Sequence, residues 1–219
     1  MEMEKESLLL TEDECYAKLK DAIRTGALMP NQRLVEMDMA KAFHAARATV
    51  RTALARLEQE GLVERERYRG ARVRMVTERE AVEIMEVRTA LECVTVRHAA
   101  QNATEEDCKA LEEIIAEMER HYRVNDLLEY SEGNARLHGT LIRMARHTTA
   151  AKVLDTLNTQ SVRFQYRTIL SQGRPELSLA EHKEIVDAVV RRDPDAAEQA
   201  MRKHLQNVLD TLRALHTQE

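Results

Sequence analysis

The sequence predicts a mainly α-helical protein, in which an N-terminal winged helix-turn-helix is followed by an all-helical bundle of about six helices. Three observations lead to this class. The 219 residues include only 6 Gly, 3 Pro and no Trp, and aromatic residues make up 3%, whereas sandwiches, barrels and doubly wound sheets need many turn and strand formers. Apolar residues recur at helical spacing along most of the chain. One stretch, 62–76, instead alternates with a period of two, which is typical of a β-hairpin.

The first 76 residues are expected to form the winged helix-turn-helix. A capping box at Thr11 begins the first helix, and Gly26 follows its end. A short helix is expected over 36–43. After a tight turn, a third helix is expected over 47–60, where Gly61 supplies a left-handed C-cap. The basic hairpin follows, with its turn expected over residues 68–71.

Residues 77–219 are expected to form the second, helical domain, with Thr77 at the boundary. Thr104 is placed to cap one helix, and Asp193 is an N-cap followed by proline at the first helical position. Gly173 and Pro175 are expected to lie in one loop. The expected helices are 78–101, 105–123, 126–146, 149–170, 178–192 and 195–216.

The net charge of −5 hides an asymmetry between these two parts. Residues 15–76 contain 13 lysines and arginines against 7 acidic residues, whereas residues 77–219 contain 19 against 25. A basic module joined to an acidic one is compatible with nucleic-acid binding, although the average charge is negative.

The cysteines and the N-terminus indicate the compartment. Cys15, Cys93 and Cys108 cannot all pair and form no CxxC motif, which favours a reducing environment. The longest N-terminal apolar run, 8–10, is flanked by acidic residues and is too short for a signal peptide or a membrane span. We therefore expect a cytoplasmic protein with no membrane partner.

The helix expected over 47–60 has the properties of a DNA-recognition helix. Val50, Leu54 and Leu57 form its buried stripe, and two arginines beside that stripe can each form paired hydrogen bonds with guanine in the major groove. A threonine hydroxyl can bind phosphate or base, and the wing tip can reach the backbone or the minor groove. The expected DNA-binding residues are Arg47, Thr49, Arg51, Arg69 and Gly70. The alternative is an ordinary solvated helix face beside a charged hairpin.

Several short blocks in this region carry a family resemblance. They are Leu34-Val35-Glu36, Arg47-Ala48-Thr49-Val50-Arg51, Leu57-Glu58-Gln59-Glu60-Gly61 and Arg69-Gly70. Together they resemble the GntR family of bacterial repressors, which implies that Arg47 and Arg51 contact the operator. Two positions depart from the family pattern: Ala46 stands where serine or threonine is usual, and Thr49 where proline is common. The change at Ala46 is expected to remove a cap or phosphate contact.

Polar residues interrupt the apolar stripes of the second domain. Asn134 and His138 lie one turn apart, and His182 and His204 lie on the stripes of the last two expected helices. Buried polar groups need partners. Three imidazoles and one amide oxygen can satisfy one another by sharing a metal ion, which would keep about two coordination positions open. The alternative is that each histidine is an ordinary hydrogen-bonded core residue.

A second resemblance bears on these residues. Its carriers are Val87-Arg88 with Leu91-Glu92, Asn134-xxx-His138, Glu181-His182 and Met201-xx-His204-Leu205. They resemble the FCD effector domain of the FadR-like GntR subfamily. The resemblance implies that Asn134, His138, His182 and His204 hold a divalent ion, with zinc, nickel and manganese all open. Asn134 replaces the commoner aspartate, so metal affinity is expected to be weaker.

Arg88 falls on the apolar stripe of the helix expected over 78–101. A buried guanidinium needs an anion. Either Arg88 binds a carboxylate effector beside the metal, or it pairs internally with an acid such as Glu92. Arg167 is a second candidate for effector binding.

The sequence therefore predicts a GntR-type transcriptional repressor that binds a palindromic operator in double-stranded DNA as a homodimer. A small organic acid is expected to bind near the metal and to change operator affinity. One alternative is a regulator that senses the metal itself. Another is a metal-dependent hydrolase joined to a DNA-binding domain. Because no HExxH motif or His–Asp dyad supplies a general base, we expect no enzyme activity.

Overall fold

The structure is a computed structural model of the chain, and it describes residues 9–66 and 70–216. The chain divides into two compact units, Met1–Val76 and Thr77–Glu219. Within the described residues, no helix combines the length and hydropathy that crossing a membrane requires.

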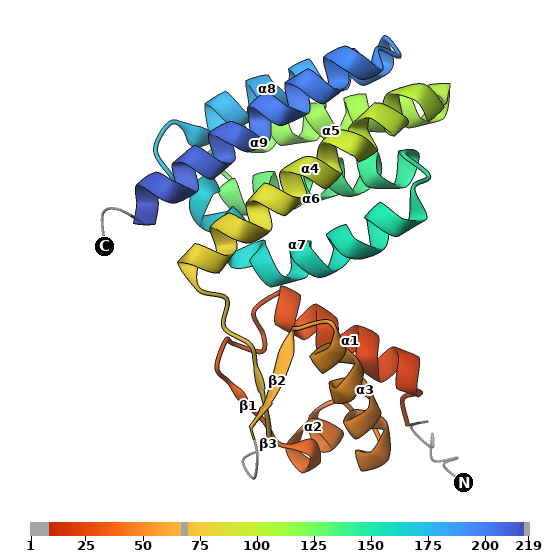
Figure 1. The fold of residues 1–219 in the computed structure, drawn as a ribbon, viewed down its shortest axis with the longest axis vertical. Helices are drawn as coiled ribbons and strands as arrows, with labels where there is room; N and C mark the ends of the chain where they lie inside the picture. The colour runs from red at the N-terminus through yellow and green to blue at the C-terminus, as the bar shows by residue number, and fades with distance from the viewer. Residues whose placement is uncertain (1–8, 67–69, 217–219) are drawn as a thin grey trace, which may run out of the picture. The chain divides into compact units, whose positions relative to one another are not determined.

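Unit 1 contains three helices beside a small antiparallel sheet (Figure 1). Helix α3 packs against both α1 and α2, and the sheet has the strand order β1-β3-β2. Apolar side chains from all three helices and the sheet form one buried core. The elements are α1 (Glu12–Arg24), β1 (Arg33–Leu34), α2 (Glu36–Ala42), α3 (Arg47–Gln59), β2 (Val63–Glu66) and β3 (Gly70–Val73).

The ends of these helices follow their capping residues. The predicted capping box is confirmed, because Thr11 Oγ1 accepts from the backbone of Glu14 while the Glu14 carboxylate accepts from the backbone of Thr11 at 2.9 Å. Gly61 follows α3 with φ of 67°, a left-handed conformation that glycine adopts without steric cost. Both helices therefore end within one or two residues of their predicted positions.

The sheet departs from the prediction in two places. Strand β1 was not expected, because two residues are too short to leave a periodic pattern; it pairs with β3 through Arg33 and Arg72. Gly70 and Ala71 were expected in the hairpin turn, but both pair with β2 as part of β3. Tyr68 and Arg69, also expected in that turn, lie outside the described residues.

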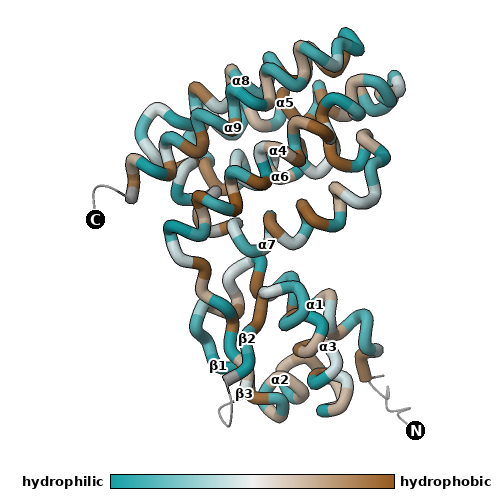
Figure 2. The backbone as a smooth tube through the Cα atoms, in the orientation of Figure 1, coloured by the Kyte–Doolittle hydropathy of each residue, from teal (hydrophilic) through white to brown (hydrophobic). Residues whose placement is uncertain are grey.

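Unit 2 is a bundle in which α4 packs against α6, α7, α8 and α9 (Figure 1). Hydrophobic and hydrophilic residues alternate along its helices in the way that buried and exposed faces require (Figure 2). The six expected helices are all present. They are α4 (Glu78–Asn102), α5 (Glu105–Arg123), α6 (Leu127–Met144), α7 (Thr148–Ile169), α8 (Arg174–Val190) and α9 (Pro194–His216).

The start of α8 is the largest error in the prediction of this unit. The helix begins at Arg174, and Pro175 lies in its first turn instead of in a loop. Proline is tolerated there because backbone N–H groups in the first turn have no partner within the helix. Gly173 precedes the helix with φ of 75°. The earlier start adds a turn and places Arg174 inside the bundle.

Candidate DNA-reading helix and metal centre

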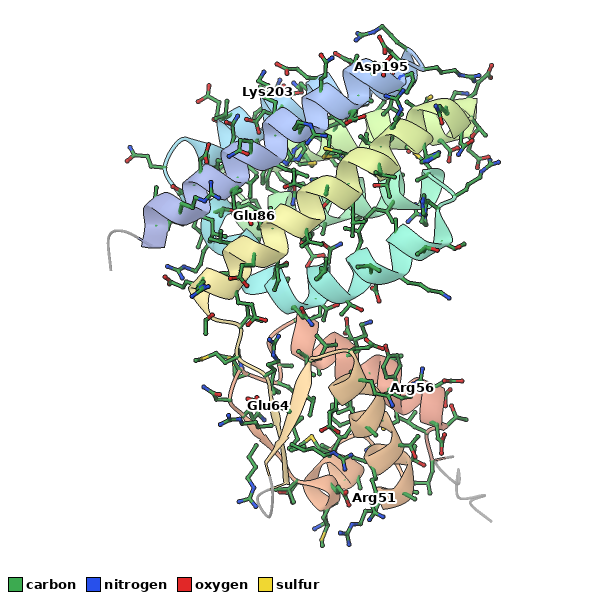
Figure 3. The ribbon with its side chains drawn as sticks, viewed as in Figure 1. Arg51, Arg56, Glu64, Glu86, Asp195 and Lys203 are labelled. Carbon is green, nitrogen blue, oxygen red and sulfur yellow. The ribbon has the colours of Figure 1, made fainter. Side chains whose placement is uncertain are left out.

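Helix α3 exposes the two arginines that the sequence singled out. Arg47 and Arg51 lie one turn apart, and Figure 3 shows Arg51 at the surface of unit 1. Both bind Glu36, the first residue of α2: Arg47 Nε lies 2.9 Å from Glu36 Oε2, and Arg51 Nε lies 3.1 Å from Glu36 Oε1. One carboxylate therefore holds both guanidinium groups in the DNA-free protein.

The hydrogen bonds between Glu36 and the two arginines favour the charged form of the Glu36 carboxyl and of the Arg51 guanidinium. Hydrogen bonds from Arg51 and then from Arg47 lower the pKa of the Glu36 carboxyl, and the bond to Glu36 raises the pKa of Arg51. Both arginine side chains are more than half exposed, so water screens these pairs and DNA can replace Glu36 at little cost. Glu36 is thus the acceptor that both arginines use in this structure.

A groove of about 510 Å³ runs between α3 and the wing within unit 1. It brings together Arg33 and Arg65 with Arg47 and Arg51, and Gly70 lies in its wall with φ of 87°. Arg65 also contacts α3, since its Nε lies 3.0 Å from Glu58 Oε2. Four cations around one open groove suit the phosphate backbone.

Two of the predicted DNA-binding residues remain, Thr49 and Arg69. Thr49 is half-buried in the first turn of α3. Ala46 is the N-cap of α3 and makes no side-chain cap bond, so the first turn lacks the hydroxyl acceptor that serine or threonine would supply. Arg69 lies outside the described residues.

In unit 2, three histidines from three helices meet in the interior. His138 comes from α6, His182 from α8 and His204 from α9, and all three are buried. One ring nitrogen from each lies within 4.8 Å of the others, and His138 Nε2 is 3.3 Å from His182 Nε2. This spacing allows one ion to reach all three rings with modest side-chain adjustment.

Two glutamates orient two of these rings. Glu92 Oε2 lies 2.5 Å from His138 Nδ1, and Glu181 Oε2 lies 2.7 Å from His204 Nδ1. A carboxylate on Nδ1 fixes the proton there and leaves Nε2 as a lone-pair donor, as in carboxylate–histidine–metal triads. Burial alone would raise the pKa of the Glu92 carboxyl, but Arg88 and His138 outweigh it and hold that pKa well below its usual range.

The third ring has an unpartnered atom. His182 is fully buried, and its Nδ1 has no hydrogen-bond partner among the described residues. Burial, followed by the neighbouring histidines, lowers the pKa of His182 well below 6.5, and burial does the same for His204. Neutral imidazoles are the form that binds metal. The donor set therefore fits a divalent ion.

A small cavity of about 30 Å³ adjoins the cluster. Asn134 is half-buried and lines it together with His138 and His204. Arg88 and Arg174 line it as well. The four predicted metal-binding residues therefore lie close together in the structure. The rings of the three histidines are close to one another, and Asn134 lines the same cavity as His138 and His204.

The two predicted effector-binding arginines have different surroundings. Arg88 is buried and adopts the internal pair: its Nη2 and Nε lie 2.6 and 3.2 Å from Glu92 Oε1, and its Nη1 lies 3.3 Å from Met85 Sδ. Arg167 lies 2.9 Å from Glu78 and is not among the described residues that line the cavity.

Sequence reasoning missed two members of this cluster. Glu181 accepts from Arg174 Nη2 at 2.9 Å and from Asn207 Nδ2 at 2.6 Å. A signal for Glu181 was available, since it lies beside His182 on a helix with few exposed positions. No signal for Arg174 existed while its segment was expected to be a loop.

An exposed basic helix beside a β-wing, joined to a helical domain with a buried histidine cluster, is the architecture of a DNA-binding regulator. The comparisons with known proteins agree. Residues 11–73 match the family model of bacterial regulatory proteins of the gntR family, and residues 83–207 match that of the FCD domain. The chain belongs to the GntR family of bacterial transcriptional regulators and carries a C-terminal FCD domain.

Similar proteins span nearly the whole chain. The HTH-type transcriptional repressor RspR of Escherichia coli K12 is 27% identical over 202 residues, covering 92% of this chain and 89% of that protein. The Nta operon transcriptional regulator of Aminobacter aminovorans is 23% identical, covering 84% and 85%.

Solved structures share the fold. E. coli McbR/YncC superposes with a TM-score of 0.80 at 18% identity, covering 95% of this chain and all of that one. A GntR family member from Pseudomonas syringae pv. tomato DC3000 gives 0.55 at 22% identity, covering 94% and 86%. The family model and the relatives, rather than these structures, make the chain a DNA-binding transcriptional regulator and not an enzyme.

Proposed function

We propose that this regulator is a homodimeric repressor whose operator affinity is set by a small carboxylate effector bound beside a divalent metal ion in the FCD domain. The observation that carries the proposal is the buried cluster of His138, His182 and His204, two of which, His138 and His204, line a small cavity together with Arg88 and Arg174. A cluster of neutral donors with adjoining space suits an ion that keeps coordination positions open.

The DNA-binding part of the proposal rests on the groove of unit 1. We assign the base contacts to Arg47 and Arg51, with Thr49, Arg69 and Gly70 contacting the sugar–phosphate backbone or the minor groove. Binding exchanges Glu36 for DNA at both arginines. Two-fold symmetry would place two such helices in major grooves one helical turn apart, which requires a palindromic operator.

The metal would be held by Asn134, His138, His182 and His204. When bound, the ion supplies positive charge and open positions for an effector oxygen, and zinc, nickel and manganese all accept such ligands. Glu92 and Glu181 hold two of the rings in place.

An exposed apolar strip on unit 2 supports the homodimer. Val87 and Val94 lie seven residues apart on α4, and Val153 lies on α7, which packs beside α4; these residues are 50%, 42% and 43% exposed. Apolar residues repeating at that spacing form one helix face. A second copy of this face would cover the strip symmetrically.

The cavity size links binding to movement. About 30 Å³ holds about two water molecules on the scale at which one water needs 10–15 Å³. An organic acid must therefore widen the cavity by shifting the surrounding helices. Such an effector binds one arrangement of the bundle better than another, which is the condition for control.

Metal sensing is the second candidate function. It is favoured because the three histidines come from three different helices, so that ion binding itself would change the packing of the bundle. In that case the ion is the effector, and no organic acid is needed.

One experiment tests these proposals. Operator fragments are selected from random DNA with the purified chain, and operator affinity is measured by fluorescence anisotropy on metal-free protein, zinc-loaded protein, and zinc-loaded protein with a panel of carboxylic acids. Equal affinity with and without zinc excludes metal sensing, and no response to any acid overturns the effector proposal. Arg51→Ala should abolish specific binding with the fold intact. His182→Ala with His204→Ala should reduce zinc content measured by elemental analysis.

A further inference from the structure

Two buried relays of the same composition meet at the cavity of unit 2. In the first, Glu92 binds both Arg88 and His138. In the second, Glu181 binds both Arg174 and His204. In each relay a glutamate holds one arginine and one histidine of the cluster. The two relays differ in how many nitrogen atoms of each arginine have a partner.

Arg88 uses all three of its side-chain nitrogens. Its Nε and Nη2 bind Glu92, and its Nη1 contacts the Met85 sulfur. Arg174 is 5% exposed and uses only Nη2, which lies 2.9 Å from Glu181 Oε2. Its Nε and Nη1 are buried and have no hydrogen-bond partner among the described residues. Buried charged donors without acceptors are strongly unfavourable, so they indicate a missing acceptor.

The location of Arg174 indicates where this acceptor belongs. Arg174 lines the same small cavity as Asn134, His138 and His204. Ser178, one turn further along α8, also lines it. An acceptor in this cavity would face both the unpartnered guanidinium and the histidine cluster.

The charge of the site favours an anion as this acceptor. Each relay pairs one arginine with one glutamate, and Asn134 contributes no charge. A divalent ion among neutral ligands would therefore leave about two uncompensated positive charges in a buried place, which needs anionic ligands. Planar guanidinium groups bind carboxylates particularly well.

We propose that Arg174, and not Arg88, is the residue that binds the carboxylate of a small organic acid in this cavity. The inference rests on the proposed function, because it assumes that the cavity is the effector site. It adds the anchoring residue and the class of ligand, a compact acid with at least one carboxylate. Arg88 then has a positioning role, in which it holds Glu92 and through it His138.

The test compares acetate with its neutral analogue acetamide on zinc-loaded protein, using isothermal titration calorimetry. Arg174→Lys keeps the charge opposite Glu181 but removes the two unpartnered nitrogens, so acetate affinity should fall about tenfold or more, with zinc content and helical circular dichroism unchanged. Arg174→Gln should lower it at least as much. Arg136→Lys, an equally conservative change of an exposed α6 arginine that pairs with Glu117, should have no effect.

The outcomes separate this inference from the proposed function. If the wild type binds acetate and both Arg174 variants bind it with the same affinity, the assignment of Arg174 is overturned, but the proposed effector site is not. Loss of affinity in Arg88→Lys but not in Arg174→Lys also overturns it. Wild-type protein that binds zinc but no acid overturns both proposals. If the Arg174 variants fold poorly, a crystal structure of the wild type grown with acetate decides: a carboxylate beyond hydrogen-bond distance from Arg174 refutes the inference.

Discussion

Lowering the pH should destabilise the metal-free protein well above the pH at which carboxylates titrate, and two buried histidines are the reason. The pKa of His182 and that of His204 are both held well below 6.5, first of all by burial. In the unfolded chain both imidazoles return to ordinary values near 6.5 and take up protons as the pH falls. The unfolded state then binds more protons than the folded state, so the free energy of unfolding decreases.

The size of the effect follows from the unfolded-state pKa. A histidine that stays neutral in the folded protein loses roughly 1 to 2 kcal/mol of stabilisation between about pH 7.5 and about pH 5.5. Two such residues give a loss of about 3 kcal/mol, a large fraction of the stability of a typical domain. Glu92 does not add to this loss, because a carboxyl with a lowered pKa contributes stability that disappears only below its usual value of 4.5.

Urea denaturation followed by far-ultraviolet circular dichroism in the presence of a chelator measures this loss, since most helical residues belong to unit 2. His182→Gln should remove about half of the pH dependence. His44→Gln is the matched control, because His44 is an exposed histidine outside the buried cluster. A free energy of unfolding that is flat over this pH range, or a pH dependence that His182→Gln leaves intact, would refute the argument from burial.

Four further predictions address other parts of the molecule. Ala46→Ser should raise the free energy of unfolding of unit 1 by about 1 kcal/mol, measured by thermal unfolding, because α3 has no side-chain cap; no gain would show that the cap is already satisfied. Glu36→Gln should strengthen operator binding at low salt, with the gain shrinking as salt is added, and anisotropy that shows weaker binding would mean that Glu36 positions the arginines. Val94→Glu should give a folded monomer in sedimentation experiments, and a persistent dimer would exclude the α4 face. Asn134→Asp should tighten zinc binding about tenfold in a chelator competition, and unchanged affinity would remove residue 134 from the metal site.

Most of the fold could be predicted because local signals mark the ends of its helices. The capping boxes at Thr11 and Thr104 and the N-cap at Asp193 are encoded by residues within one turn of each helix end. Where the signal was ambiguous, the prediction was wrong. Pro175 was taken for a loop residue, although proline is compatible with both a loop and the first turn of a helix. Strand β1 depends on pairing with distant β3, which no local pattern reveals.

The candidate site could be predicted only in part, for a related reason. A histidine on an apolar stripe is visible in the sequence as an exception to the helical pattern, and His138, His182 and His204 were found in this way. A glutamate or arginine in a helix is usually solvated, so only its place beside His182 marks Glu181, and nothing in the pattern marks Arg174 as buried. Only the packing of α8 against α9 brings Glu181 within 2.7 Å of His204.

The relay through Glu181 would give the proposed effector a route to the rest of the bundle. An acid bound to Nε and Nη1 of Arg174 would share the guanidinium with Glu181, which binds Nη2 and also holds His204 of α9. A change in the hydrogen bond between Glu181 and His204 would alter how α9 packs against α4, its main neighbour. Helix α4 starts at Glu78, two residues after Val76, the last residue of unit 1. A shift of α4 would therefore be transmitted along the chain to the wing, and a ligand that fills the cavity without binding Arg174 should leave operator affinity unchanged.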